Sequence, residues 1–293
     1  MTAAFAVSRL CKQHPGFQLG PIDLALREGE IMGLVGVNGA GKTTLLRLLA
    51  GITAPDTGNV EVLGHRLPGA QVAARRDLAF ASEDMRLYAT RTLDWHIAFV
   101  RQVVPQWDAD YAAMLMQRFD LRGDQVVGGF SHGQRVKALL LLCLARRPRL
   151  LLLDEPTTGL DPVARAEVLE ALADVLRDER RSVLFSSHHT HDVEQLADTI
   201  TMLHAGRVVA SAGKEEFLDA WRRVLCTGHA PSDLAAWADL ALVRQSGSQC
   251  ELKVRRWRDD LPARLAAAGL EVQRIDAMTL EDIFVSSVRT RAA

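Results

Sequence analysis

The sequence predicts an α/β fold whose core is a mostly parallel sheet. Short, largely apolar runs that are typical of strands occur at residues 31–35, 150–153 and 182–187, and segments of helical period separate them. Strands that alternate with helices in this way usually pair in parallel. The first run is apolar throughout, as a strand is when both faces of its sheet are covered. A glycine-rich segment at residues 36–41 joins that strand directly to a helix.

The N-terminal part of the chain is rich in strand-like patterns. Short runs of this kind occupy residues 5–7 and 22–26, before the buried run at 31–35. Residues 43–50 then follow with helical period and stop at Gly51, a residue type that commonly ends a helix. We therefore expect a β-rich N-terminal part that leads into a strand, a loop and a helix.

The middle of the chain changes from strand-like to helical patterns. The simplest account is an α-helical insert between two parts of the α/β core, a subdomain of about residues 86–148. Its helices are expected at residues 93–104, 109–119 and 133–145.

The core resumes after the insert with a buried strand at residues 150–154. Helices and strands then alternate, and a turn at residues 204–207 joins two last strands in a hairpin. These later elements are expected at 162–177 (helix), 182–187 (strand), 190–197 (helix), and 200–203 and 208–211 (strands).

The sequence becomes less regular beyond about Trp221. We expect one domain at residues 1–220 and a small accessory domain, of α/β or α+β type, at 221–293. Within the accessory domain, the expected elements are two strands in 239–254, a helix at 261–268, a strand at 270–275 and a helix at 280–288.

Composition and charge narrow the classes of function. The chain has 293 residues, a formal net charge of −1 and 5% aromatic residues, so it offers neither a basic field nor an aromatic surface for nucleic acid. Its N-terminus lacks the pattern of a signal peptide. No uncharged apolar stretch reaches the roughly 18 residues that a transmembrane segment requires. We expect no nucleic-acid partner, and a membrane role only through another protein.

Residues Gly36 to Thr43 carry the pattern GxxxxGK[ST] between a strand and a helix. Its glycines let consecutive backbone N–H groups turn around phosphate oxygens at the positive end of the following helix. Lys42 would place its charge on the β- and γ-phosphates, and the Thr43 hydroxyl can bind Mg²⁺. The alternative is a chance glycine-rich turn, which the flanking strand and helix disfavour. We therefore expect ATP and Mg²⁺ as the bound groups.

Two carboxylates follow the buried strand at residues 150–153. Asp154 would lie at the C-terminal tip of the strand, the end beside the phosphate site in doubly wound sheets, and would bind Mg²⁺ directly or through water. Glu155 is placed to polarise the water that attacks the terminal phosphate. The alternative is a solvated acidic pair at the end of a strand.

His188 follows the strand at residues 182–187. A histidine at that tip can reach the γ-phosphate and respond to its presence, although a lone histidine is more often structural. His189 and His191 are expected to face solvent at the start of a helix. A metal site built from the three histidines is disfavoured, because no cysteine or paired carboxylate completes it.

With two further motifs, these segments resemble the nucleotide-binding subunit of ABC transporters from about Phe5 to Leu218. The resemblance is specific because the motifs occur in the order and spacing of that family. It implies a P-loop NTPase in which Lys42, Glu155 and His188 are catalytic. The matching segments are Gly36–Thr44 (Walker A), Leu150–Glu155 (Walker B with the catalytic glutamate), Phe130–Gln134 (signature motif), Gly159–Asp161 (D-loop) and His188 (switch histidine). The residues that this implies for ATP binding are Gly36, Val37, Asn38, Gly39, Ala40, Gly41, Lys42, Thr43 and Thr44.

The chain departs from the family pattern at three places. His132 replaces the first glycine of the signature motif and is expected to point outward rather than toward the γ-phosphate. Glu83 stands where many relatives have glutamine, and its oxygen can still serve Mg²⁺ or a water. The aromatic residue that stacks on adenine aligns best with His14, with Phe17 as a second candidate.

The resemblance also implies that two ATP-binding subunits, identical or related, face each other across the nucleotide. ATP held by one copy would meet the signature motif of the other, and Asp161 would belong to the D-loop near that contact. The signature residues concerned are Ser131, His132, Gly133 and Gln134, with His132 at the altered position.

Integral-membrane permease subunits are the other implied partners. In this family they dock on the helical insert, which places the chain at the cytoplasmic face of the membrane. Trp95 and Trp107 are expected to pack within the insert. Residues 104–108, 154–162 and 279–285 resemble the branch that exports drugs, antibiotics or lipids. The alternatives are an importer subunit, and a soluble ATPase that acts on ribosomes or DNA.

Overall fold

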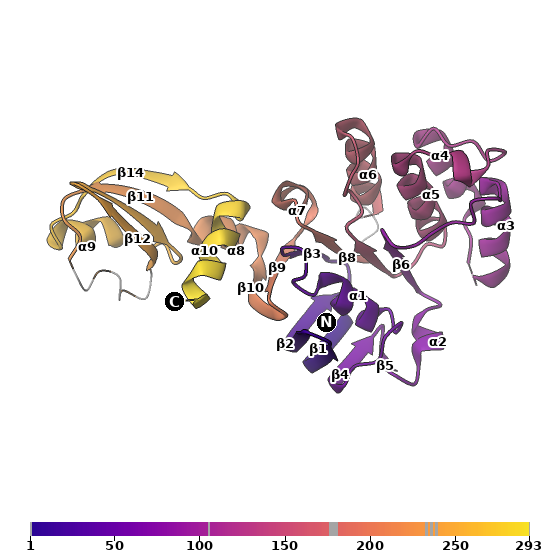
Figure 1. Ribbon diagram of the computed structural model, residues 1–293, viewed down its shortest axis with the longest axis horizontal. Helices are drawn as coiled ribbons and strands as arrows, with labels where there is room; N and C mark the ends of the chain where they lie inside the picture. The colour runs from indigo at the N-terminus through magenta and orange to yellow at the C-terminus, as the bar shows by residue number, and fades with distance from the viewer. Residues whose placement is uncertain are drawn as a thin grey trace. The chain divides into compact units, whose positions relative to one another are not determined.

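The computed structural model describes residues 2–104, 106–175, 181–231, 234, 237 and 240–292. The chain forms two compact units, Met1–Val208 and Val209–Ala293 (Figure 1). This division precedes the domain boundary predicted at residue 220. The division of the chain into two functional domains at residue 220 therefore stays a prediction.

A six-stranded sheet, in the order β10-β9-β3-β8-β7-β6, forms the core. The strands from β9 to β6 pair in parallel, which confirms the predicted α/β class. Every residue of β3, β7 and β8 is buried, as their apolar runs predict. The strands are β3 (Ile31–Val35), β6 (Leu78–Ser82), β7 (Leu150–Asp154), β8 (Ser182–Ser187), β9 (Thr199–His204) and β10 (Arg207–Gly213).

Three helices each follow one of the central strands. α1 (Lys42–Leu49) follows β3, α6 (Pro162–Val175) follows β7, and α7 (Thr190–Leu196) follows β8. Since β3, β8 and β7 are parallel neighbours, their C-terminal ends meet at one edge of the sheet. The predicted phosphate, carboxylate and histidine motifs therefore leave the sheet side by side. Residues 176–177, the expected end of the helix at α6, lie outside the described residues.

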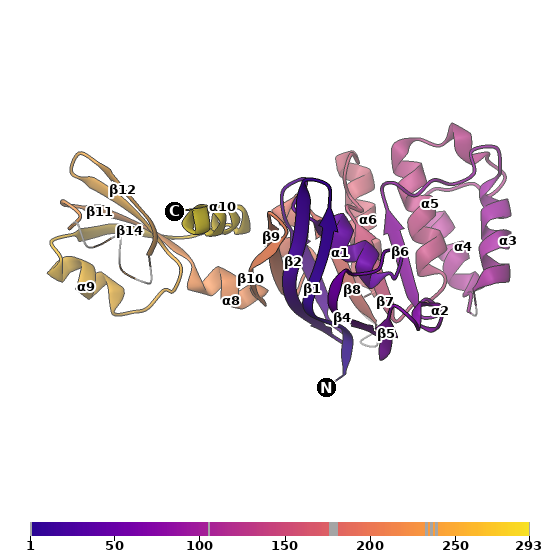
Figure 2. The ribbon, with the colours of Figure 1, turned by 60° about the horizontal axis from the view of Figure 1, so that its bottom comes forward.

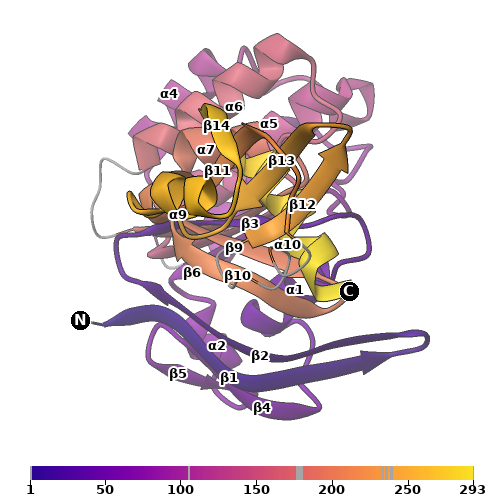
Figure 3. The same ribbon diagram turned by 90° about the vertical axis from the view of Figure 1, so that its left-hand side faces the viewer.

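A second, antiparallel sheet has the order β2-β1-β4-β5 (Figure 3). β1 (Ala3–His14) and β2 (Phe17–Arg27) form a long hairpin, while β4 (Thr57–Val62) and β5 (His65–Leu67) extend it. One hydrophobic cluster joins this sheet, α1 and the parallel sheet. The sequence predicted a β-rich N-terminal part but not β4, because only two of its six residues are buried.

The predicted insert is helical, and its helices begin at or within one residue of the expected positions. It contains α3 (Leu93–Val103), α4 (Ala109–Arg118) and α5 (His132–Leu144), which gather beside β6 (Figure 2). Polar caps start the first two of these helices: the Thr92 hydroxyl accepts the N–H of Trp95 at 3.2 Å, and Asp108 accepts that of Tyr111 at 2.8 Å. Shorter helical segments, α2 (Gln71–Ala74) and the 3₁₀ turn Val127–Gly129, lie on either side of the insert's first two helices in the sequence.

The second unit contains an antiparallel sheet in the order β12-β13-β11-β14. The expected strands and helices are present, and the structure adds α8 and the strand β11, which has only two buried residues, Val224 and Cys226. The elements are α8 (Lys214–Ala220), β11 (Arg222–Thr227), β12 (Leu240–Ser246), β13 (Gln249–Val254), α9 (Leu261–Ala267), β14 (Glu271–Ala277) and α10 (Leu280–Ala292).

No helix in the described parts of the chain is long and apolar enough to cross a membrane. The longest of them, α6, has 14 residues, whereas a spanning helix needs about 20.

The turn between β9 and β10 fixes the hairpin β1–β2 against the parallel sheet. Gly206 donates its N–H to the Ala40 carbonyl at 3.0 Å and accepts the N–H of Gly20 at 2.7 Å. Its φ of +76° is one that side chains rarely adopt, and an added Cβ would collide with the Gln18 carbonyl oxygen.

Gly206→Ala should therefore lower the free energy of unfolding by about 3 kcal/mol or more, measured by urea denaturation. Gly64→Ala is the matched control: its φ is +79° but no atom lies within 4 Å of an added Cβ, so it should cost only about 1–2 kcal/mol. Equal losses in the two variants would contradict the close approach at Gly206.

Candidate functional site

The glycine-rich loop lies between the end of β3 and the start of α1. Gly41 immediately precedes α1 with a φ of +107°, a left-handed value that glycine tolerates best. A Cβ at this position would also stand 2.9 Å from Cζ of Phe17, so the aromatic ring rests directly on the loop. The missing side chain at Gly41 thus lets the loop turn into the helix beneath Phe17.

A cavity of about 510 Å³ opens above this loop. It brings together most of the predicted ATP-binding residues with Glu83, which is exposed, and with the carboxylates of Asp154 and Glu155. Phe17 lines the cavity, whereas His14, its partner across the β1–β2 hairpin, does not. The lining residues are Phe17, Asn38, Gly39, Ala40, Gly41, Lys42, Thr43, Thr44, Glu83, Asp84, Asp154 and Glu155. Gly36 and Val37 contribute instead through their carbonyl groups.

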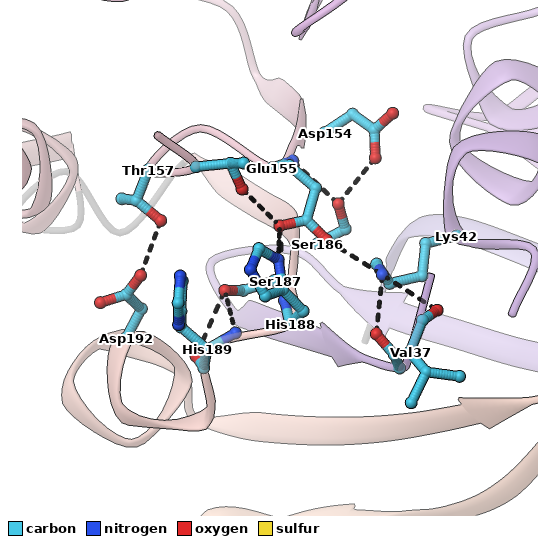
Figure 4. A network of polar contacts seen from close by, with 12 residues as sticks. Val37, Lys42, Asp154, Glu155, Thr157, Ser186, Ser187, His188, His189 and Asp192 are labelled. Carbon is cyan, nitrogen blue, oxygen red and sulfur yellow. Dashed lines mark hydrogen bonds and ion pairs between the residues drawn. The ribbon is translucent and has the colours of Figure 1, made fainter. Parts of the chain in front are cut away.

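Lys42 is buried at the first position of α1, and its ammonium has three acceptors. It donates to the carbonyl oxygens of Gly36 at 2.7 Å and Val37 at 3.4 Å. Its third contact is an ion pair with Oε1 of Glu155 at 2.9 Å (Figure 4). These contacts hold the positive charge at the floor of the cavity.

Asp154 ends β7 and joins two neighbouring elements through its two oxygens. Oδ2 accepts the hydroxyl of Thr43 at 2.6 Å, and Oδ1 accepts that of Ser186 at 2.7 Å. Ser186 also accepts the N–H of Glu155 at 2.9 Å. Ser186 was not predicted from the sequence as a site residue, although its place beside Asp154 follows from the pairing of β7 with β8.

The oxygens of Thr43 and Asp154 fit a magnesium ion. A hydroxyl and a carboxylate are hard donors, and Mg²⁺ is typically held by one or two carboxylates together with waters and substrate phosphates. Their 2.6 Å contact places both donors at one point of the cavity wall. Within the described residues, no three His, Cys, Asp or Glu side chains form a metal-binding group of their own, the three neighbouring histidines included.

Glu155 lies at the centre of the polar network in Figure 4. Its Oε2 accepts the Nδ1–H of His188 at 2.7 Å and the hydroxyl of Thr158 at 2.8 Å. Burial raises the pKa of Glu155, but the hydrogen bond and charge of Lys42, together with Thr158 and His188, outweigh it and leave the pKa below its usual value. Glu155 therefore stays ionised at neutral pH, as a proton acceptor must.

The backbone at Glu155 is strained, with a φ of +53°. Such a conformation costs on the order of 1–3 kcal/mol in a residue with a side chain and persists where surrounding contacts determine it. Here, the contacts are the ion pair with Lys42 and the hydrogen bond from the Glu155 N–H to Ser186.

A second buried network, not predicted from the sequence, supports the loop after Glu155. The Thr157 hydroxyl donates to Oδ2 of Asp192 at 2.6 Å (Figure 4). Arg165 pairs with Oδ1 of Asp192 at 2.6 Å. Asp192 is fully buried in α7, so the network connects the loop, α6 and α7.

His189 and His191, the two histidines that follow His188, differ in how far they are exposed. His191 is exposed, as expected, and contacts Gln195 at 3.2 Å. His189 is half-buried, with its ring 4.1 Å from that of His188, so the expectation that it faces solvent is wrong. Burial and the nearby His188 lower the pKa of His189.

The signature motif starts α5 with reciprocal hydrogen bonds. The Ser131 hydroxyl accepts the N–H of Gln134 at 3.1 Å, and Oε1 of Gln134 accepts the N–H of Ser131 at 2.9 Å. Gly133 packs against Ala164 of α6. His132 does not extend outward into solvent, because its Nε2 lies 2.9 Å from the Thr158 carbonyl oxygen.

Asp161 of the predicted D-loop caps α6. Its Oδ1 accepts the N–H groups of Val163 at 2.9 Å and Ala164 at 3.0 Å. These backbone hydrogen bonds lower the pKa of Asp161.

Known proteins match both the sequence and the fold. The family model described as ABC transporter matches residues 19–158. The chain is 26% identical to the ABC transporter ATP-binding protein YtrB of Bacillus subtilis over 95% of this chain and 96% of YtrB. It is 32% identical to the ABC transporter ATP-binding protein NatA of the same organism, over 69% of this chain and 84% of NatA. A solved ATP-binding subunit of an ABC transporter superposes with a TM-score of 0.66 at 27% identity, over 74% of this chain and 92% of that chain.

Relatives named for either direction of transport also match. The daunorubicin resistance protein DrrA3 of Streptomyces coeruleorubidus is 35% identical over 68% of this chain and 64% of its own length. The methionine import protein MetN of Cupriavidus necator is 32% identical over 65% of this chain and 58% of its own length. The matched family model and the likeness to ATP-binding proteins such as NatA show that the chain belongs to the ABC transporter family, as an ATP-binding subunit that hydrolyses ATP to drive transport.

Proposed function

We propose that two copies of this chain, or this chain and a related subunit, close around ATP and Mg²⁺ at the cytoplasmic face of a membrane and power export through separate permease subunits. The contact between Glu155 and Lys42 carries the proposal. It puts an ionised carboxylate beside the cation that would hold the γ-phosphate, at the mouth of a phosphate-binding loop. Hydrolysis of ATP requires these groups within reach of one phosphate.

The ammonium of Lys42 would exchange partners when ATP binds. A triphosphate carries more negative charge than the single carboxylate of Glu155, so the phosphate oxygens attract Lys42 more strongly. Glu155 would remain held by Thr158 and His188 and could accept a proton from the attacking water. Through its Nδ1–H, His188 would keep that carboxylate oriented.

Thr43 and Asp154 are the residues proposed to hold Mg²⁺, with Glu83 at the rim of the same cavity as the third. The bound ion would neutralise charge on the phosphates. The hydroxyl of Ser186 orients Asp154 by donating to its carboxylate at 2.7 Å.

A second subunit is needed because this chain does not complete its own site. The signature residues Ser131 to Gln134 are absent from the residues that line the cavity above Lys42. Ser131 is exposed at the first turn of α5, where backbone N–H groups attract phosphate oxygens. The Ser131 of one copy would therefore meet the γ-phosphate held by the other, as the family resemblance implies.

The helical insert offers a surface for the permease subunits. Trp95, Phe99 and Val103 lie one helical turn apart on α3, and Phe99 and Val103 are 46% and 66% exposed. The Trp95 and Phe99 rings stack at 5.4 Å, and Tyr88, 64% exposed, meets the edge of Trp95. An exposed apolar stripe of this kind favours docking of a partner. Export is supported by the segments resembling exporters and by the drug resistance protein among the relatives.

Glu155→Gln should retain ATP binding but reduce the turnover number at least about 100-fold, because an amide cannot accept the proton of the attacking water. Phosphate release and binding of a fluorescent ATP analogue would measure the two properties. Glu61→Gln removes an exposed carboxylate of β4 as a control and should leave both unchanged. Turnover close to that of the parent would refute the role of Glu155.

Mixing two inactive variants tests the shared site. Lys42→Ala and Ser131→Ala should each be inactive alone, but a mixed dimer has one intact site, which combines Lys42 of one copy with Ser131 of the other. Random mixing should restore up to about a quarter of the parent ATPase rate, since half of the dimers are mixed and each has one of two sites. No recovery in a mixture that forms dimers would contradict the arrangement.

With daunorubicin, the compound in the name of the relative DrrA3, as the proposed test substrate, Phe99→Asp should abolish ATP-driven accumulation in inverted membrane vesicles that contain this chain and its permease, because a charge would interrupt the apolar stripe on α3. The ATPase activity of the purified chain should persist. Val72→Asp places the same charge on a 75% exposed residue of α2 and should not affect accumulation. ATP-driven loss of preloaded compound from the vesicles would contradict export.

A further inference from the structure

The His132 side chain crosses from the start of α5 to the loop that follows β7. Its Nε2 stands 2.9 Å from the carbonyl oxygen of Thr158. The ring also lies against Gly159, where an added Cβ would be 3.1 Å from Nε2. The absence of a side chain at Gly159 therefore leaves room for the imidazole.

The carbonyl oxygen of Thr158 determines which ring nitrogen of His132 carries a hydrogen. A carbonyl oxygen only accepts hydrogen bonds, so Nε2 must be the donor. Because Nε2 carries a hydrogen in this neutral tautomer and in the charged imidazolium, the contact does not depend on the ionisation state of His132. The side chain can thus act as a fixed connection rather than as a pH-dependent one.

Thr158 continues the connection to Glu155. Its hydroxyl donates to Oε2 of Glu155 at 2.8 Å, and its N–H donates to the Glu155 carbonyl oxygen at 3.2 Å. His132 fixes the carbonyl of Thr158, while the hydroxyl of the same residue fixes the carboxylate. One residue of the loop, Thr158, therefore contacts both the start of α5 and the carboxylate of Glu155.

We propose that His132 is a positioning residue for ATP hydrolysis, which links the signature helix of one subunit to the Glu155 carboxylate of that same subunit through Thr158. The proposal rests on the proposed roles of Glu155 and the signature motif. Since the signature motif would contact the ATP of the opposite site, a displacement of α5 there would move Thr158 and with it Glu155. The two ATP sites of a dimer would be coupled within each chain by this route.

Three substitutions of His132 separate the hydrogen bond from the bulk of the side chain. His132→Ala should lower the turnover number about tenfold and change the KM for ATP by less than about twofold, because the carboxylate is misplaced while the phosphate loop is intact. His132→Gln should restore most of the rate, since its amide nitrogen lies about as far from the main chain as Nε2. His132→Asn places its donor nearer to the main chain and should not.

Thr158→Val tests the route, because it removes the hydroxyl that reaches Glu155 but keeps the carbonyl that His132 contacts. If His132 acts through Thr158, the double variant should be no slower than the slower single variant. Lys137→Ala is the matched control: it breaks a different contact of α5, the ion pair of Lys137 with Glu167 of α6, and should leave the rate near that of the parent.

Several outcomes would overturn the proposal: an unchanged rate in His132→Ala, multiplicative losses in the double variant, or an equal loss in Lys137→Ala. Should His132→Ala fail to fold, the comparison of His132→Gln with His132→Asn still decides, because equal rates in those two variants would also exclude the link. A Glu155→Gln variant with parental turnover would instead refute the proposed function. The two failures are thus distinguishable.

Discussion

The ion pair between Lys42 and Glu155 is the interaction on which the arrangement of the site depends. The two side chains are only 6% and 13% exposed, and a buried charge without its partner would cost several kcal/mol. Lys42 begins the helix α1 that follows the loop after β3, and Glu155 belongs to the loop after β7, with β8 between these strands. Their pairing holds the start of that helix and the second loop together across a third strand. Because the ammonium of Lys42 and the carboxylate of Glu155 neutralise each other, the pair adds no net charge to the cavity until a more strongly charged ligand enters.

The parallel sheet makes that pairing possible. Strand order brings the ends of β3, β8 and β7 together, and the register pairs Asp154 directly with Ser186. A hydroxyl from one strand thereby fixes a carboxylate from the next. The helical insert adds a further constraint through α5, which is anchored to the same loop by His132. The phosphate end of the site is thus fixed by the core, and the carboxylate end by both the core and the insert.

The sequence alone predicted the features that depend on local patterns. The apolar runs of β3, β7 and β8 and the capped helices of the insert were predicted closely, and the glycine-rich loop lies where its motif requires. Features that depend on pairing between distant segments were not accessible. The roles of Ser186 and Thr158 arise only when strands and loops meet, and β11 was hidden because exposed or half-buried residues surround Val224 and Cys226. His14 and Phe17 are partners across one hairpin, so alignment could not choose between them, whereas the cavity contains Phe17.

The ring of Phe17 on Gly41 has a consequence for nucleotide choice. Phe17 is the one aromatic side chain among the described residues that line the cavity above Lys42. A flat hydrocarbon face stacks on any base, because every base offers a π-face and stacking reads no hydrogen-bond pattern. A subunit that held its nucleotide in this way would recognise the triphosphate by its charge and shape and would discriminate weakly between adenine and guanine. The abundance of ATP over GTP around the protein, more than any contact to the base, would then decide which nucleotide occupies the site.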